Sequence, residues 1–398
     1  MPDKHKRVMD ALELREPDRV PVMDLMNEFS TSNAILGKKP NPLGKLIQDR
    51  RTSGIMDRLL ALPGSARLTD RELERFTHLG AAAAVRMDYD AAWLSCFPVL
   101  RFRDSRVMND IFGRLCDVSV DAAGNLANPI YREGLIKTPA DWDAWPKRDI
   151  FRLPEKVNRV FREVQQEYGD RLFIFAFANY GLFENAWQPM GFERFAVAAR
   201  KEKGFLRRVI RFYSDLLCML MEAVADAGVP GFVHTDDLAF KSGPMLSPRL
   251  IEELFGDHYR RITETAHALG LKIVMHSCGN TTSMLENFVS WGFDALHPLE
   301  PTAGVDLAAA KKAVGNRICL VGNLDITHIL VDATREEVFA AVRRAIGDAG
   351  AGGGFILAPD HSHPDISVER LRWMVEAARE YGAYPLKPWP ETAGEGRG

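Results

Sequence analysis

The stretch KIVMHSCGNTTSMLENF, residues 272–288, joins an apolar run to an amphipathic helical pattern, and two reactive side chains lie at the junction. His276 and Cys278 are two positions apart where the apolar run ends. In an extended segment, residues i and i+2 point to the same side. The imidazole and the thiol can therefore reach one object.

The same alternation of apolar run and helical pattern recurs along the chain. Helical segments carry their own start signals, such as Ser247 before Pro248 and the capping box of Thr334 with Glu337. Eight alternations predict an α/β fold, a closed parallel (β/α)8 TIM barrel. A doubly wound open sheet is the competing arrangement, because the pattern does not prove closure. The predicted strands lie at 19–25, 89–95, 171–178, 231–236, 272–277, 294–299, 317–323 and 353–359.

Two stretches exceed what a barrel requires. We expect residues 1–385 to form a single barrel domain with insertions at 26–88 and 101–170, both in the N-terminal half. The first insertion reads as helical, and the second as a hairpin around DAAGN followed by a helix start in TPADWDAWP. Neither carries enough apolar residues for a core of its own. The Pro/Gly-rich end, 386–398, is expected to be a flexible tail.

Composition excludes several classes of protein. The 398 residues carry a formal net charge of −3, which gives no basic footprint for nucleic acid. No apolar run approaches the roughly 18 residues of a membrane span, and the N-terminus lacks the apolar region of a secretory signal. We therefore expect a cytoplasmic protein that binds neither nucleic acid nor a membrane. Five scattered cysteines are not a disulfide framework, and the sequence leaves a homodimer open.

Polar side chains follow the predicted strands and should converge on one mouth, because chemistry in such barrels lies at the C-terminal strand ends. A single Asp or Asn can equally cap a helix or satisfy a loop. Because polar groups follow nearly every predicted strand, however, they indicate a polar rim around the mouth that can bind metal. The predicted substrate-binding residues are Asp24, Asn27, Glu28, Trp93, Cys96, Asn179, Tyr180, Glu300, Asn323 and His363.

A catalytic zinc site needs about three protein ligands and one open position. His276 and Cys278 supply two, and another strand end must supply the rest. His361 follows the eighth strand and should face the same mouth; Glu300, Asp360 and His363 are also eligible. A buried thiol beside a hydrogen-bonded imidazole is the alternative that needs no metal.

Several stretches together resemble the uroporphyrinogen decarboxylase superfamily. They are EPDRVPV near the start, LSPRLIEELFGDHYRRI in the middle, VMHSCGN, GNLD, and ILAPDHSHPDISVERLRWMVEAA near the end. The resemblance covers essentially the whole chain and implies the barrel fold. That superfamily contains tetrapyrrole decarboxylases and corrinoid-linked methyltransferases.

The decarboxylase branch carries an arginine-rich segment after the first strand and an Asp after the second. Here the first position reads VMDLMNEFSTSNAIL, without arginine, and Cys96 stands where the Asp would be. A polyanionic macrocycle requires cationic groups that bind carboxylates. The resemblance therefore disfavours porphyrinogen decarboxylation.

The methyltransferase branch binds zinc through a His-x-Cys pair after the fifth strand and a Cys after the eighth. His276 and Cys278 match the pair, whereas His361 stands at the third position, where the decarboxylases also carry histidine. The resemblance implies His276, Cys278 and His361 as zinc ligands. It leaves open a carboxylate in place of His361, or no metal.

The resemblance also implies a reaction. Zinc would act as a Lewis acid on the heteroatom that carries a methyl group, and the methyl would pass to the cobalt of a corrinoid. The chain contains no Asp-x-His-x-x-Gly motif, so the corrinoid would be held by a separate carrier protein. Aromatic residues near the mouth favour a phenyl methyl ether as the methyl donor, and hence an O-demethylase component. If a thiol were the substrate, it would accept the methyl group and the direction of transfer would be reversed; the sequence leaves this direction open.

Two other hypotheses stay open. One is a decarboxylase of a smaller acid on the same barrel, with Asp236, Asp237 and His361 as its acid/base groups. The other is a non-catalytic binder of a corrinoid or tetrapyrrole. In the methyltransferase hypothesis, His361 could also protonate the departing oxygen, because an imidazole titrates near neutral pH.

Overall fold

The structure is a computed structural model that describes residues 3–39, 44–46, 49, 51–60, 65–96, 100–178 and 180–387. Eight parallel strands form its centre, and each lies within or overlaps one of the eight predicted runs, so the predicted barrel is confirmed. In barrel order they are β1 (Met23–Leu25), β2 (Ala91–Ser95), β7 (Phe173–Phe177), β8 (Gly231–Thr235), β11 (Lys272–His276), β12 (Ala295–His297), β13 (Cys319–Leu324) and β14 (Phe355–Pro359).

The first and last strands meet and close the barrel. Val22 and Leu357 form a parallel bridge, and the Leu357 N–H donates to the Pro21 carbonyl at 2.9 Å. This seam is shorter than the ladders between the other neighbours, so the barrel is nearly closed rather than uniformly paired. The open, doubly wound sheet is excluded.

The strands are buried on both faces, which explains their continuous apolar sequences. Alternate side chains point inward and form one cluster inside the barrel, while the others pack against the surrounding helices. Cys319 belongs to the inner cluster and has no exposed surface, as expected of a packing residue. The inner cluster also includes Met23, Leu25, Trp93, Phe173, Phe175, Phe177, Val233, Val274, Val321 and Ile356.

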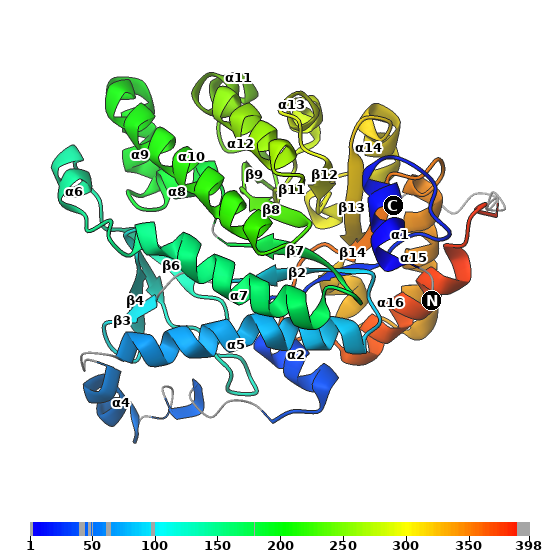
Figure 1. Cartoon of the computed structure of the whole chain (residues 1–398), viewed down its shortest axis with the longest axis horizontal. Helices are drawn as coiled ribbons and strands as arrows, with labels where there is room; N and C mark the ends of the chain where they lie inside the picture. The colour runs from blue at the N-terminus through cyan, green and yellow to red at the C-terminus, as the bar shows by residue number, and fades with distance from the viewer. Residues whose placement is uncertain are drawn as a thin grey trace.

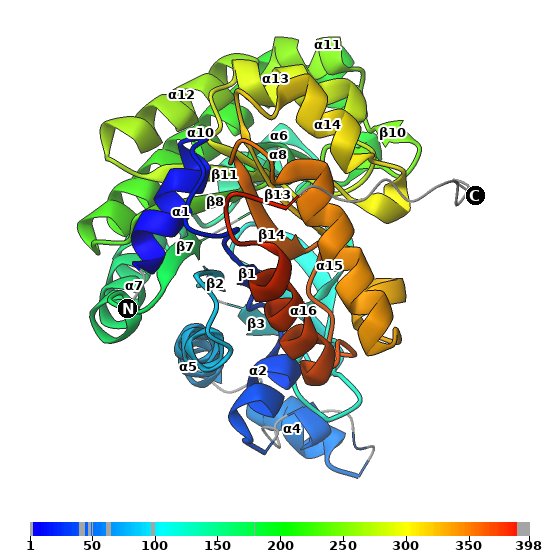
Figure 2. The same ribbon diagram turned by 90° about the vertical axis from the view of Figure 1, so that its right-hand side faces the viewer.

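Helices surround the strands on the outside (Figures 1 and 2). The helix predicted to start at Ser247 is α11 (Pro248–Ile251), which continues through a π-helical turn into α12 (Asp257–Ala268). The predicted capping box of Thr334 and Glu337 is present at the start of α15. The other outer helices are α7 (Leu153–Tyr168), α10 (Lys203–Asp226), α13 (Leu285–Ser290), α14 (Leu307–Val314), α15 (Arg335–Ala349) and α16 (Val368–Tyr381).

The inserted segments hold further elements. Helices α2 (Phe29–Leu36), α4 (Ser53–Leu60) and α5 (Ser65–Arg86) separate β1 from β2 and lie together in both ribbon views (Figures 1 and 2). The second insertion contains the predicted hairpin, β5 (Arg114–Asp117) with β6 (Ile130–Gly134). It also contains β3 (Leu100–Phe102) and β4 (Val107–Asp110), which complete a four-stranded antiparallel sheet that the sequence did not predict. Helix α6 (Pro139–Ala144) follows at the predicted TPADWDAWP.

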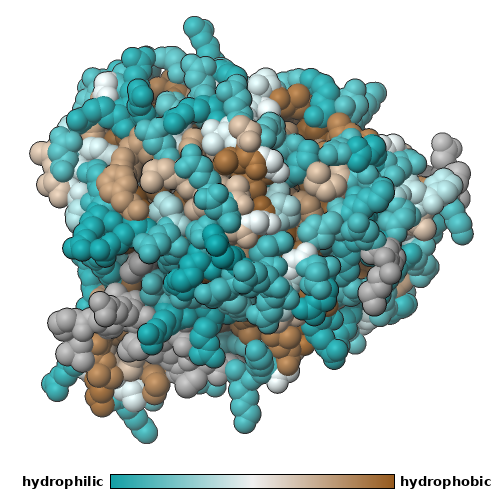
Figure 3. Space-filling model, in the orientation of Figure 1, coloured by the Kyte–Doolittle hydropathy of each residue, from teal (hydrophilic) through white to brown (hydrophobic). Residues whose placement is uncertain are grey.

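The remaining elements are short or terminal. Helix α1 (Lys4–Leu12) precedes the barrel, and α8 (Leu182–Trp187) and α9 (Phe192–Lys201) follow β7. The hairpin β9 (Ala239–Phe240) and β10 (Gly243–Pro244) follows β8. Among the described residues, no helix is long and apolar enough to cross a membrane. The face in Figure 3 is mainly hydrophilic, with hydrophobic areas interrupted by polar side chains. Residues 388–398 of the expected tail lie outside the described residues.

A buried ion network holds the N-terminal helix against the barrel. Asp90, just before β2, accepts hydrogen bonds from Arg7 at 2.5 Å, from Arg19 at 2.9 Å and from the Val22 N–H at 3.0 Å. Arg7 and Asp90 are buried, whereas Asp18, the second partner of Arg7, is half exposed. Because these residues lie at the N-terminal strand ends, away from the mouth, we expect them to act on stability.

Replacement of Asp90 by Ala should lower the free energy of unfolding by about 3–5 kcal/mol, because it removes the fully buried carboxylate shared by Arg7 and Arg19 and leaves Arg7 with only the half-exposed Asp18. Urea unfolding would measure the loss. Asp18→Ala is the matched control: it removes an exposed partner of the same arginine and should cost no more than about 1 kcal/mol. Equal small losses in the two variants would contradict the structural role of Asp90.

Candidate metal centre

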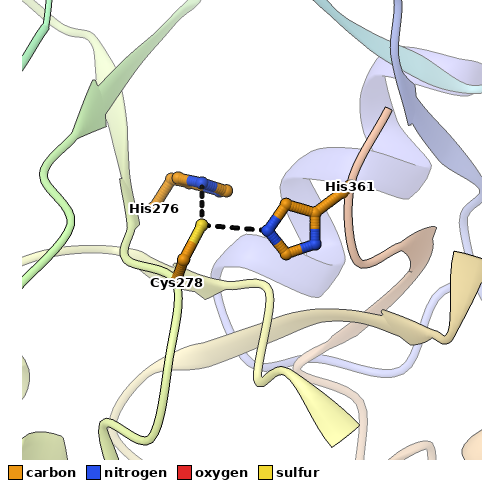
Figure 4. A group of neighbouring side chains, drawn as sticks. All are labelled: His276, Cys278 and His361. Carbon is orange, nitrogen blue, oxygen red and sulfur yellow. Dashed lines mark hydrogen bonds between the residues drawn. The ribbon is translucent and has the colours of Figure 1, made fainter. Parts of the chain in front are cut away.

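Three predicted ligands meet at the mouth of the barrel. His276 ends β11, Cys278 follows two residues later, and His361 follows the end of β14 by two residues. The Cys278 sulfur lies 3.1 Å from His276 Nε2 and 3.0 Å from His361 Nε2. Figure 4 shows the sulfur between the two imidazoles. All three donor atoms lie within 4.8 Å of one another.

The loop that carries Cys278 is shaped by a glycine and fixed by two carboxylates. Gly279 has φ +83°, and a Cβ there would lie 2.4 Å from the Ala239 carbonyl oxygen, so the close turn requires glycine. The Cys278 N–H donates to Asp237 at 2.9 Å, and the Gly279 N–H donates to Glu300 at 2.8 Å. These carboxylates therefore hold the backbone beside the sulfur.

Burial and neighbouring charges together shift the pKa of each of the three groups. Burial, with the neighbouring His297 and His361, holds the pKa of His276 well below its usual value. Burial, with the charge and hydrogen bonding of Asp237, raises the pKa of the Cys278 thiol well above its usual value. Burial opposes protonation of His361, but Asp360, Glu300 and Asp237 together raise its pKa. These shifts favour the neutral thiol and the neutral His276 ring, and they favour protonation of His361.

The donor set fits zinc. Two imidazole nitrogens and one cysteine sulfur are the ligand types that zinc takes in proteins, and three ligands leave a position open for chemistry. Asp237 Oδ1 lies 3.8 Å from His276 Nε2, so a carboxylate is also at hand. The geometry supports a metal centre without requiring any rearrangement between distant elements.

Glu184 lies beside this centre and was missed by the sequence analysis. Burial and the charges of Asp237 and Asp236 raise its pKa well above the usual value. Gln188 donates to Glu184 at 2.6 Å and accepts from the buried Arg114 at 2.9 Å. The i, i+4 spacing of Glu184 and Gln188 was the available signal, but the segment FENAW reads as an aromatic core helix.

Asp236 does not face the centre. Its carboxylate accepts hydrogen bonds from the Phe183 and Glu184 N–H groups at 2.8 Å each, and from the Tyr259 hydroxyl at 2.6 Å. His234 Nε2 lies 3.2 Å from the same carboxylate. Both oxygens are occupied by protein donors and the residue is fully buried. The geometry thus favours a role in holding the start of α8.

Asp24, within β1, and Glu28, three residues after its end, line a small pocket. Asp24 accepts from the Tyr89 hydroxyl at 2.9 Å, and Glu28 accepts from Asn128 at 2.9 Å. Burial raises the pKa of each of these two carboxyls to about 7. The pocket is lined by Asp24, Leu25, Met26, Glu28, Thr31, Ser362, His363, Ile366 and Leu371.

The other predicted substrate-binding residues are scattered around the centre. Trp93 packs edge-on against His276, with 5.1 Å between ring centroids, and Tyr180 is covered by Arg114 at 4.1 Å. Cys96 is not brought to the mouth: it lies in the outer cluster, and burial raises its pKa to about 11. In the rest of the set, Asn27 accepts from Ser95, Asn323 donates to the Leu299 carbonyl, and Asn179 lies outside the described residues.

The fold and the site define an α/β-barrel protein with a metal-capable His/Cys/His centre at the C-terminal strand ends. Residues 112–381 match the uroporphyrinogen decarboxylase (URO-D) family. The chain belongs to this family, as the sequence resemblance implied.

Relatives of two activities are similar to the chain. A methylcobamide:CoM methyltransferase, MtaA of Methanosarcina barkeri, is 26% identical over 184 residues, 46% of this chain and 51% of that protein. A uroporphyrinogen decarboxylase of Chlorobium phaeovibrioides is 25% identical over 306 residues, 71% of this chain and 79% of that protein. The alignment with the methyltransferase thus spans about half of its length.

A solved structure shows the same fold. A methyltransferase from Methanosarcina mazei superposes with a TM-score of 0.69, covering 95% of this chain and 99% of that one, at 17% identity. Such a likeness supports the fold. Activity must be argued from the site.

Asp24 should make stability depend on pH. Because burial raises its folded-state pKa from 3.8 to about 7, the folded protein keeps a proton that the unfolded chain has released between these pH values. The free energy of unfolding therefore falls as pH rises through this window, by at most about 4 kcal/mol. Asp24→Asn removes this dependence and keeps an acceptor for Tyr89. Urea unfolding at pH 5 and pH 8 should show the Asp24→Asn variant gaining stability relative to the wild type at pH 8; a difference that does not change with pH would contradict the assignment.

Proposed function

We propose that this protein is a zinc-dependent methyltransferase, the demethylating component of a system that moves a methyl group from a small, aromatic methyl ether to the cobalt of a corrinoid on a separate carrier protein. One observation carries the proposal: His276, Cys278 and His361 place three zinc-type donors within 4.8 Å of one another. The similarity to methylcobamide:CoM methyltransferases supports the corrinoid and its carrier.

His276, Cys278 and His361 would hold the zinc, with Asp237 and Glu300 fixing the loop between the first two. A zinc ion held there supplies Lewis-acid polarisation of the heteroatom that carries the methyl group. Trp93 is buried edge-on against His276 and makes the barrel interior beneath the centre apolar, which supports an aromatic substrate.

The departing oxygen must gain a proton as its bond to the methyl group breaks. Two groups near the centre favour their protonated form. The pKa of His361 is raised despite its burial, through Asp360, and the pKa of Glu184 is raised by burial and by Asp237. Either group can supply this proton, and His361 can do so only when it is not itself a metal ligand.

Decarboxylation of a small acid is the second candidate function. The decarboxylase from Chlorobium phaeovibrioides aligns with more of the chain than MtaA does. Against it, both oxygens of Asp236 are occupied by protein donors, which removes one of the acid/base groups this function would use. A turnover assay separates both candidates from a non-catalytic corrinoid or tetrapyrrole binder.

Replacement of Cys278 by Ser should remove most of the metal from the purified protein, because a hydroxyl is a far poorer zinc ligand than a thiolate. Metal analysis should find near-stoichiometric zinc in the wild type. Cys116→Ser, in the inserted sheet, is the matched control and should keep its zinc. Thermal unfolding should remain cooperative in both variants. Unchanged zinc in Cys278→Ser would show that His276 and Cys278 are structural.

Methyl transfer should require an added corrinoid carrier, since the chain has no corrinoid-binding motif of its own. Incubation with candidate methyl ethers, with and without a reduced corrinoid protein, would measure the release of the demethylated product. Product release by the isolated chain, without corrinoid, would contradict the proposal. Carbon dioxide release from a carboxylic acid would instead support the decarboxylase.

His361 is tested by two replacements. As a ligand, its loss in His361→Ala should lower zinc affinity by well over the roughly 10–100-fold typical of an outer-shell change. As a proton donor, it should leave zinc bound and reduce turnover by about 10²–10⁴. We favour the ligand role. His361→Cys should then keep zinc, because the thiolate replaces one ligand by another. Full metal and full activity in His361→Ala would exclude both roles.

A further inference from the structure

A second histidine lies directly behind the metal centre. His297 ends β12 beside His276, and the two residues are partners in the register of β11 and β12. Their Nδ1 atoms are 2.6 Å apart, and the rings are nearly parallel, 26° between planes. His297 Nε2 lies 3.1 Å from the Pro359 carbonyl oxygen. This imidazole is fully buried, and the sequence assigned it no specific role.

The two hydrogen bonds that join His276, His297 and the Pro359 carbonyl have a fixed direction. A carbonyl oxygen only accepts, so His297 Nε2 must carry a hydrogen. His297 is fully buried, and its two hydrogen-bond partners are an imidazole and a carbonyl rather than a carboxylate, so the ring is neutral and its Nδ1 is an acceptor. His276 Nδ1 must then donate to it. His276 is buried as well, and a neutral ring that carries its hydrogen on Nδ1 has its lone pair on Nε2.

That lone pair points toward the centre. His276 Nε2 lies 3.1 Å from the Cys278 sulfur, at the position where a metal ligand is needed. The opposite tautomer would place a hydrogen on this nitrogen and would have to rearrange before a metal could bind. It would also leave two acceptor nitrogens facing each other across 2.6 Å. The buried hydrogen bonds of His297 thus stabilise the His276 tautomer that has hydrogen on Nδ1 and a lone pair on Nε2.

We propose that His297 is a positioning residue that holds His276 in its metal-binding tautomer and ties it to the strand that leads to His361. The inference rests on the proposed metal centre. Pro359 is the last residue of β14, two positions before His361. A single imidazole therefore links the ends of β11, β12 and β14, and the three candidate ligands extend from the first and last of these strands.

The tautomer can be read directly in the metal-free protein. Nitrogen NMR of 15N-histidine-labelled protein distinguishes a protonated ring nitrogen from one with a lone pair. The wild type should show His276 with hydrogen on Nδ1 and a lone pair on Nε2. His297→Leu should lose this preference, whereas His297→Asn should retain it, because the Asn oxygen can still accept near the position of Nδ1.

Zinc affinity gives a second readout, measured by competition with a chelator. Affinity should fall about 10–100-fold in His297→Leu and by less in His297→Asn. His234→Leu is the matched control, since His234 is an equally buried histidine on the neighbouring β8 whose ring bonds to Leu182 and Asp236 rather than to His276. Its zinc affinity should match that of the wild type.

Two results would overturn the inference. One is wild-type zinc affinity in His297→Leu, and the other is a wild-type spectrum with hydrogen on His276 Nε2. If His297→Leu does not fold, the same measurements on His297→Asn decide: loss of the tautomer there contradicts the proposal. Because the spectra need no metal, a protein that shows the expected tautomer yet binds no zinc would count against the proposed function alone.

Discussion

Closure of the barrel is the constraint on which the candidate centre depends. β11 and β14 are separated by β12 and β13, which in a flat sheet would place their ends about 14 Å apart at roughly 4.8 Å per strand. The seam from Leu357 to Pro21 curves the sheet back on itself. Only then do the loops after β11 and β14 meet over one mouth and bring His361 within 3.0 Å of the Cys278 sulfur.

Sequence patterns predicted the parts that repeat. Buried parallel strands give continuous apolar runs, so all eight strands were found, and the barrel rule then brought His361 to His276 and Cys278. The position of Cys96 also follows from alternation, once Trp93 is known to point inward, because residues three apart on a strand face opposite sides. The sequence alone did not show which set of alternate side chains on each strand points into the barrel.

Other features were hidden because they depend on contacts between distant segments. The strands β3 and β4 are three and four residues long and only partly buried, too short for a periodic signal. Asp236 reads as a rim residue, but it is turned toward α8 and Tyr259, which only the folded chain places there. Glu184 lies in an aromatic-rich stretch, and its importance comes from Asp236 and Asp237, which follow another strand.

The two ends of the barrel use buried charge in opposite ways. At the N-terminal end, the buried carboxylate of Asp90 is paired with Arg7 and Arg19 and ties these segments together. Beside the metal centre, burial and the charges of Asp237 and Asp236 instead raise the pKa of Glu184. Carboxyls in that state lower stability near neutral pH, and strongly shifted groups gather at functional sites. The raised pKa of Glu184 therefore agrees with chemistry at the mouth, next to the His/Cys/His group.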